Sequence, residues 1–133
     1  MLNKREYNEI RFFEYIPEVE NIKTMPLIVY LHGAGERGTD IEKLNTHGPI
    51  KEMLAGKVKS NFIVIAPQCE EIKTWWDYAE ILYNWILEYI KQPFVDKKRV
   101  YLTGNSMGGY GTWSLAMAHP ELFAASVPTC GGG

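Results

Sequence analysis

One serine in the sequence lies between two glycines at a spacing that suits nucleophilic chemistry. Gly104, Ser106 and Gly108 fit the pattern G-x-S-x-G, which places a serine on a sharp, strained turn between a strand and a helix. The turn projects the hydroxyl toward a base and a bound carbonyl, and side chains two residues to either side would collide. An ordinary glycine-rich turn is the alternative. The context favours a nucleophile, because Arg99–Thr103 predicts a buried strand and Met107–Ala118 a helix whose N-terminus faces the developing oxyanion.

A second glycine-rich segment, His32–Gly38, follows the apolar run Pro26–Leu31, which predicts a strand buried on both faces. Three kinds of anion site fit this segment in part. A phosphate-binding P-loop would need Lys followed by Ser or Thr where Thr39 and Asp40 stand, and a dinucleotide site would need a helix that begins within the motif. Thr39 and Asp40 instead suggest a helix cap after the loop. An oxyanion-hole loop of the H-G-x-G type is favoured, because Ser106 is present to use it.

The rest of the chain alternates apolar runs with helical segments. Asn61–Ala66 predicts a second buried strand, and Ala124–Val127 predicts a fourth core strand after the one that leads to the serine. Glu9–Ile16 predicts an early strand near the sheet edge, and Asp40–Lys57 a short helix or two interrupted by Gly48-Pro49. This alternation predicts an α/β fold: a mainly parallel sheet with flanking helices, in which both glycine-rich loops follow the carboxyl ends of strands.

The clearest helical pattern covers Asp77–Lys91. Apolar side chains recur on one face of this segment: Tyr78, Ile81, Leu82, Trp85, Ile86 and Tyr89. Asp77 followed by Glu80 resembles a capping box, and Pro93 enforces the end of the helix. Just before it, Trp75 and Trp76 either line a substrate cleft or cover the core, and the core is favoured.

Size and composition limit the class of protein. The 133 residues are expected to form a single domain, and a hydrophobic content of 46% indicates a globular chain. A net charge of −2 gives no reason to expect nucleic-acid binding or a basic membrane-binding face. Met1–Phe13 lacks the apolar run of a signal peptide and no segment approaches the length of a membrane span, so a cytoplasmic location is expected. Cys69 and Cys130 match no zinc pattern and are expected to be buried free thiols.

Two segments carry a family resemblance: Leu31–Gly38 and Thr103–Gly109 closely resemble the α/β-hydrolase superfamily. Within it, the chain looks like the esterases that include polyhydroxybutyrate-depolymerase-like, feruloyl-esterase-like and phospholipase/carboxylesterase proteins, and that grade into the prolyl-oligopeptidase catalytic domain. The resemblance implies Ser106 as nucleophile, with the backbone N–H groups of Met107 and of Ala34, or a neighbour, as the oxyanion hole. It also implies cleavage of a small ester through an acyl-enzyme intermediate, with no cofactor or metal.

The acid and the base of such an enzyme are not apparent. The family order is serine, acid, histidine, but after Ser106 the chain offers only His119 and Glu121, in the reverse order. The intervening helix would hold His119 about 18 Å from the serine, whereas a base needs about 3 Å. His119 is therefore expected to end the helix, His32 to order its own loop, and His47 to lie in a surface turn.

These gaps lead to an expectation about the whole chain. We expect residues 1–133 to be the N-terminal part of a larger hydrolase with a C-terminally incomplete sheet, and to turn over little or no ester alone. A prolyl-oligopeptidase-type peptidase is the nearest alternative, since it uses the same machinery. A non-catalytic binding module of this fold and a nucleotide-binding protein are alternatives of other classes. The acyl group, the alcohol group and the oligomeric state stay open.

Overall fold

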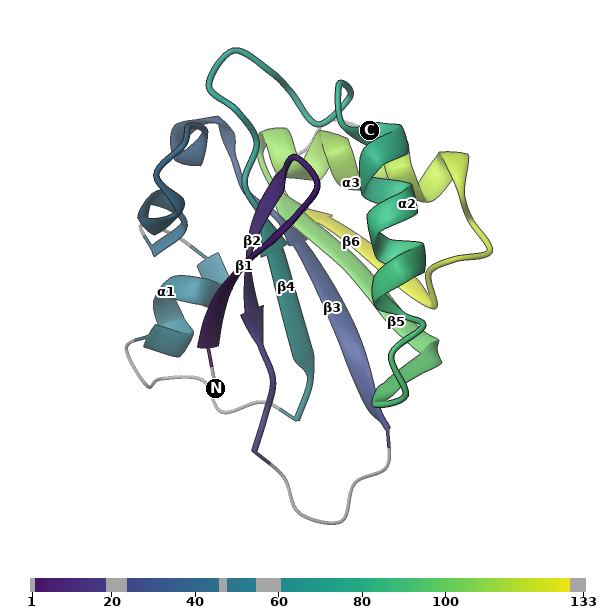
Figure 1. Cartoon of the computed structure of the whole chain (residues 1–133). Helices are drawn as coiled ribbons and strands as arrows, with labels where there is room; N and C mark the ends of the chain where they lie inside the picture. Colours follow the sequence, from purple (N-terminus) through teal and green to yellow (C-terminus); the bar gives the residue numbers. More distant parts are fainter. Residues whose placement is uncertain (1, 19–23, 46–47, 55–60, 130–133) are drawn as a thin grey trace.

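The computed structural model of the chain describes residues 2–18, 24–45, 48–54 and 61–129. These residues form a six-stranded sheet in the order β1-β2-β4-β3-β5-β6 (Figure 1). The strands are β1 Leu2–Tyr7, β2 Ile10–Tyr15, β3 Met25–Leu31, β4 Ile63–Pro67, β5 Val95–Asn105 and β6 Ala125–Thr129. Strands β4, β3, β5 and β6 run parallel, and β1 and β2 join them as an antiparallel pair at one side. The predicted mainly parallel α/β sheet is confirmed.

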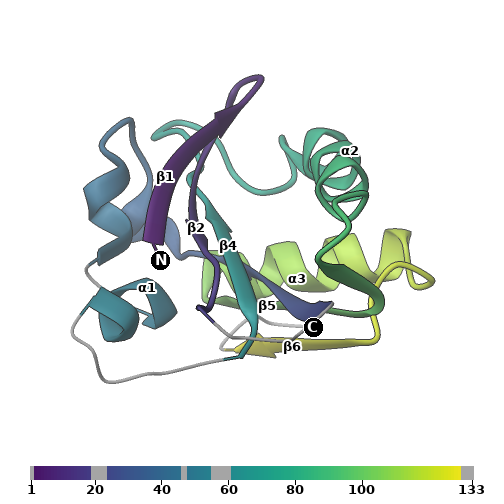
Figure 2. The same ribbon diagram turned by 60° about the horizontal axis from the view of Figure 1, so that its bottom comes forward.

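Helices cover the two faces of the sheet (Figure 2). Helices α2 Ala79–Tyr89 and α3 Met107–Ala118 lie on one face, and α1 Gly48–Leu54 lies on the other beside the short 3-10 helix η2 Ile41–Asn45. Alternate strand residues enter the two resulting cores, as the period of a strand requires. The larger core joins α2 and α3 to one set of strand residues: Phe12, Leu27, Val29, Leu31, Ile63 and Ile65. The smaller core joins Leu44 and Ile50 to the other set: Phe13, Tyr30 and Ala66.

The helix after the serine begins and ends where the sequence predicts, at Met107 and Ala118. The start of α2 differs from the prediction, because the capping box at Asp77 does not form. The Asp77 carboxylate accepts hydrogen bonds from the Thr74 backbone N–H (2.8 Å) and hydroxyl (3.3 Å), so it closes the preceding turn. Tyr78 is the N-cap residue and makes no side-chain capping bond. The predicted apolar face is nonetheless buried, apart from the half-buried Ile81.

One further expectation about the elements was confirmed, and two were wrong in part. The early strand is β2, which lies near the sheet edge as predicted; β1 pairs with it through a tight turn at Asn8 (φ 51°) and forms the edge itself. Strand β6 lies at an edge of the described sheet, and it is not buried as a core strand would be, since its Val127 is 60% exposed. Gly48-Pro49 opens α1 instead of interrupting a helix, which suits proline because the first helical turn leaves its N–H groups unpaired.

The described helices are short. None of them is long and apolar enough to cross a membrane. The Cys69 thiol is free and buried, as predicted, and burial raises its pKa to about 12. Cys130 and His47 lie outside the described residues.

Candidate active site

Ser106 lies at the turn between β5 and α3 in a strained backbone conformation. Its φ of 56° and ψ of −114° fall in a region that L-residues rarely adopt. The residue is exposed, and its backbone N–H donates to the carbonyl of Thr129 at the end of β6 (2.9 Å). The predicted sharp strand-to-helix turn is therefore present, and it holds the serine at the surface.

The two glycines of the motif are required by close backbone contacts. A Cβ on Gly104 would lie 2.2 Å from the carbonyl oxygen of Gly108 and 2.8 Å from that of Leu31. A Cβ on Gly108 would lie only 1.8 Å from the Leu31 oxygen. These distances are all far shorter than van der Waals contact. The atoms met are backbone oxygens, which cannot move aside by changing a side-chain rotamer. The prediction that side chains would collide here is confirmed, and the turn is locked between β3 and α3.

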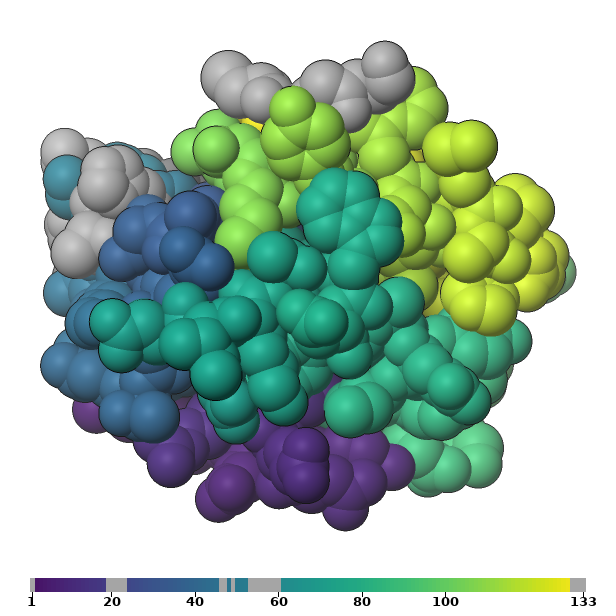
Figure 3. All heavy atoms as spheres, turned by 90° about the horizontal axis from the view of Figure 1, so that it is seen from above, coloured from purple at the N-terminus to yellow at the C-terminus, as the bar shows by residue number. Residues whose placement is uncertain are grey.

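The two glycine-rich loops lie side by side, because β3 and β5 are parallel neighbours with Leu31 opposite Gly104. A Cβ on Gly33 would lie 3.6 Å from the Cβ of Ser106. Figure 3 shows this face of the molecule, where the segment after β3 in blue, the loop after β4 in teal and the start of α3 in light green adjoin. The sheet thus brings the loop after β3 directly against the serine.

The two residues predicted to supply oxyanion N–H groups both lie near Ser106. Ala34 begins the three-residue 3-10 turn η1 Ala34–Glu36, and Met107 begins α3. Neither N–H donates a hydrogen bond to an acceptor within the described residues. No α-helix begins within the Gly33–Gly38 motif, as a dinucleotide site would need, since η1 is a 3-10 turn and α1 begins only at Gly48.

His32 orders the loop, as expected, and is not placed to act as a base. Its Nδ1 lies 2.5 Å from the carbonyl oxygen of Gly33, and its Nε2 accepts the N–H of Cys69 (2.8 Å). An Nε2 that accepts cannot carry a proton, so the ring is neutral and donates through Nδ1. Burial lowers the pKa of His32 to about 4. The Trp75 indole donates to the carbonyl of His32 (2.9 Å), which fixes the residue from a third side.

The remaining sequence candidates do not meet at Ser106. His119 ends α3 as predicted, stacks on Tyr83 with ring centroids 3.5 Å apart, and has its Nδ1 3.9 Å from the carboxylate of Glu121. The full length of α3 separates it from the serine, about 18 Å at 1.5 Å per residue. The described residues thus hold the predicted serine and N–H donors together and place this histidine elsewhere.

The neighbouring tryptophans have different environments. Trp75 is buried against His32 and Gly111, as the core assignment predicts. Trp76 is 55% exposed and packs on the exposed Tyr110 ring, with centroids 5.9 Å apart, so the core assignment was wrong for it. The sequence carried no signal to separate the two rings.

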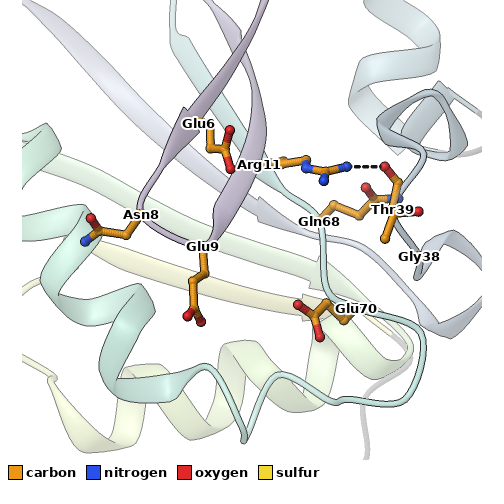
Figure 4. A pocket seen from close by; sticks show the side chains of 8 residues that line it. All are labelled: Glu6, Asn8, Glu9, Arg11, Gly38, Thr39, Gln68 and Glu70. Carbon is orange, nitrogen blue, oxygen red and sulfur yellow. Dashed lines mark hydrogen bonds between the residues drawn. The ribbon is translucent and has the colours of Figure 1, made fainter.

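A separate pocket of about 320 Å³ lies between the β1–β2 turn and the loops after β3 and β4 (Figure 4). Three carboxylates line it, from Glu6, Glu9 and Glu70, and Arg11 reaches across to donate to the carbonyl of Thr39 (2.5 Å). No group of three or more potential metal-ligating side chains among the described residues is placed to hold a metal ion. The pocket lining does not include the serine or the two N–H donors.

Comparison with known proteins finds similarity to a family and to two esterases. Residues 76–132 match the prolyl oligopeptidase family. The chain is 32% identical over 111 residues to a bifunctional acetylxylan esterase/xylanase of Neocallimastix patriciarum, covering 80% of this chain and 16% of that protein. It is 30% identical over 127 residues to a probable acetylxylan esterase A of Aspergillus fumigatus, covering 85% of this chain and 32% of that one.

A solved structure gives the same result for the fold. The crystal structure of a thermostable esterase superposes with a TM-score of 0.78 and 31% identity, covering all of this chain and 41% of that one. The chain therefore spans less than half the length of each of these three proteins. With its mainly parallel sheet, its strained serine turn and these similarities, the chain belongs to the α/β-hydrolase superfamily.

Proposed function

We propose that the chain carries the nucleophile and the oxyanion hole of a serine hydrolase that cleaves carboxylic esters. The observation that carries the proposal is the position of Ser106: exposed, strained, and near the backbone N–H groups of Ala34 and Met107, which donate to no acceptor in the described part of the chain. A serine hydroxyl with two free backbone N–H donors nearby suits acyl transfer. The names of the relatives, which are esterases, support an ester as the bond cleaved.

The proposed reaction runs in two steps. The Ser106 Oγ attacks the carbonyl carbon of the ester, and the carbonyl oxygen, now negative, accepts hydrogen bonds from Ala34 and Met107 N–H. Collapse of this intermediate breaks the bond to the alcohol and leaves an acyl-enzyme, which water cleaves to release the carboxylic acid. Losing one oxyanion donor typically costs about 3–4 kcal/mol of transition-state stabilisation. The scheme requires no metal or cofactor.

The reaction also needs a base to take the serine proton, and we propose that it lies outside these 133 residues. The relatives are more than twice as long as the matched region, which leaves ample chain to supply a histidine and an acid. The 133 residues alone are then expected to react slowly, because no base lies beside the hydroxyl in the described part of the chain. Acetylated xylan is the first natural substrate to test, since two relatives are named for it.

The test uses the full-length gene product that contains this chain. It is treated with a fluorophosphonate probe and assayed on p-nitrophenyl acetate, and we expect labelling and turnover that Ser106→Ala abolishes. Ser114→Ala, on the same helix, is the matched control and should keep both activities. Unchanged labelling and hydrolysis in Ser106→Ala would show that another residue is the nucleophile.

A second candidate is a serine peptidase of the prolyl oligopeptidase type, favoured by the match of residues 76–132 to that family. The machinery would be the same, so the substrate decides. Turnover of peptidyl p-nitroanilides well above that of esters would support the peptidase. A gene product that neither labels nor hydrolyses any of these substrates would indicate a non-catalytic protein of this fold.

A further inference from the structure

The loop that carries the Ala34 N–H is held only weakly by its own backbone. Within the 3-10 turn, Glu36 N–H lies 3.4 Å from the Gly33 oxygen and Arg37 N–H 3.3 Å from the Ala34 oxygen. Both distances exceed the usual 2.9–3.0 Å of a good backbone hydrogen bond. Such a turn does not by itself fix the direction of its first N–H groups, so side chains must do so.

Two side chains fix the peptide groups on either side of Ala34. The peptide that contains the Ala34 N–H also contains the Gly33 carbonyl, and His32 holds that oxygen through Nδ1. Since the peptide is planar and trans, holding its oxygen also sets the direction of its N–H. The next peptide contains the Ala34 carbonyl, and the Arg37 Nε donates to it (3.1 Å). The backbone of Ala34 is thereby held at both ends.

Arg37 also ties this loop to a second one. Its Nη1 donates to the carbonyl of Lys73 (3.1 Å), in the loop between β4 and α2. The same two loops are joined by the Gly38 N–H, which donates to the carbonyl of Cys69 (2.9 Å). The Arg37 guanidinium therefore links Ala34 to the loop between β4 and α2, which the Gly38–Cys69 hydrogen bond also joins to the loop after β3. Its planar fork suits two carbonyls at set angles, whereas a lysine ammonium lacks that geometry.

We infer that Arg37 is a positioning residue for the oxyanion hole: by holding the carbonyls of Ala34 and Lys73, it keeps the Ala34 N–H aimed beside Ser106. The inference rests on the proposed function, because it assigns Arg37 to the transition state of that reaction. Arg37 itself does not touch the substrate. Its removal frees the peptide that follows Ala34, so that His32 alone restrains the Ala34 N–H; this weakens a contact needed chiefly when the carbonyl oxygen becomes negative.

The experiment compares Arg37→Ala and Arg37→Lys with Arg11→Ala in the full-length gene product. Arg11 is a matched control, since it also donates from a guanidinium to a carbonyl near this loop, but to Thr39 instead of Ala34 (Figure 4). We expect Arg37→Ala to lower kcat on p-nitrophenyl acetate about 10- to 100-fold, with KM within about twofold. The inhibition constant of a phenylboronic acid, which mimics the tetrahedral intermediate, should rise by a similar factor. Arg11→Ala should change each value by less than about twofold.

Two further measurements separate positioning from general stability. Methylguanidinium added to Arg37→Ala should restore part of kcat, and should restore none in Ser106→Ala. If Arg37→Ala does not fold, Arg37→Lys and Arg37→Gln carry the same comparison. A lowered melting temperature with kcat and boronate affinity unchanged would overturn the inference and leave the proposed function standing. A wild-type protein that neither labels nor hydrolyses would overturn the proposed function, and this inference with it.

Discussion

Replacing Gly108 by alanine tests how tightly the serine turn is locked into the sheet. The added Cβ would lie 1.8 Å from the Leu31 oxygen, 2.5 Å from the Leu31 carbonyl carbon and 2.8 Å from the His32 oxygen. Carbon and oxygen atoms need about 3.3 Å or more, so the start of α3 would have to retreat by roughly 1.5 Å. All three contacts are backbone atoms in or directly after a central strand, and none of them can rotate away.

This displacement should cost both stability and activity. Overpacking a core typically costs about 1–3 kcal/mol, and a clash between two backbones belongs at the upper end or beyond. We therefore expect Gly108→Ala to lower the unfolding free energy by about 3 kcal/mol or more, and Tm by on the order of 10 °C. Because α3 carries the Met107 N–H and follows Ser106, a shift of this size should also lower kcat about 100-fold or more.

Urea and thermal unfolding of the full-length gene product measure the effect. Gly35→Ala is the control for stability, since a Cβ at Gly35 meets nothing within 4 Å. It should unfold within about 0.5 kcal/mol of the wild type. A Gly108→Ala protein as stable as the Gly35→Ala protein would refute the claim that close backbone packing selects glycine at this position.

Two further predictions concern Ser106 and His32. Ser106→Gly should raise the unfolding free energy by about 1 kcal/mol while abolishing esterase activity, because glycine relieves the strain of φ 56°; equal or lower stability than Ser106→Ala in urea would contradict this. His32→Gln should flatten the pH dependence of stability between pH 7 and 4. The pKa of His32 is about 4 in the native state, against an ordinary value of 6.5 in the unfolded chain, so the unfolded chain binds a proton first as the pH falls. This difference lowers the unfolding free energy of the wild type by up to about 3 kcal/mol near pH 4 and has no effect above pH 7. The measurement is the urea midpoint of each protein across this pH range. If the midpoint falls equally with pH in the wild type and the variant, His32 is not a buried neutral imidazole.

The elements nearest the serine were the most predictable from sequence. Helix Met107–Ala118 and the glycine contacts at Gly104 and Gly108 follow from local sequence, because a tight turn makes its demands within a few residues. The two glycine-rich loops were expected to lie side by side because the carboxyl ends of parallel strands lie at the same end of the sheet. What the sequence could not provide was the environment of individual side chains in contacts between distant segments.

The misses have both long-range and local causes. Strand β1 is mostly exposed, so it lacks the apolar alternation that marks a strand, and only pairing with β2 forms it. Asp77 caps a turn through Thr74 instead of starting α2, because two local hydrogen-bonding patterns competed for one carboxylate. The bond from Arg37 to Lys73 joins residues 36 positions apart, and neither residue is unusual for a loop.

The hydrogen bond from the Ser106 N–H to Thr129 makes the reactive turn depend on an edge strand of the described sheet. Strand β6 pairs with β5 alone among the described strands, and such edges fray well before a protein melts. Each time this edge opens, the serine loses a restraint on its unfavourable backbone while the central strands stay paired. On heating, esterase activity should then be lost before secondary structure. Any segment or partner that covers β6 in the cell would protect the activity against heat.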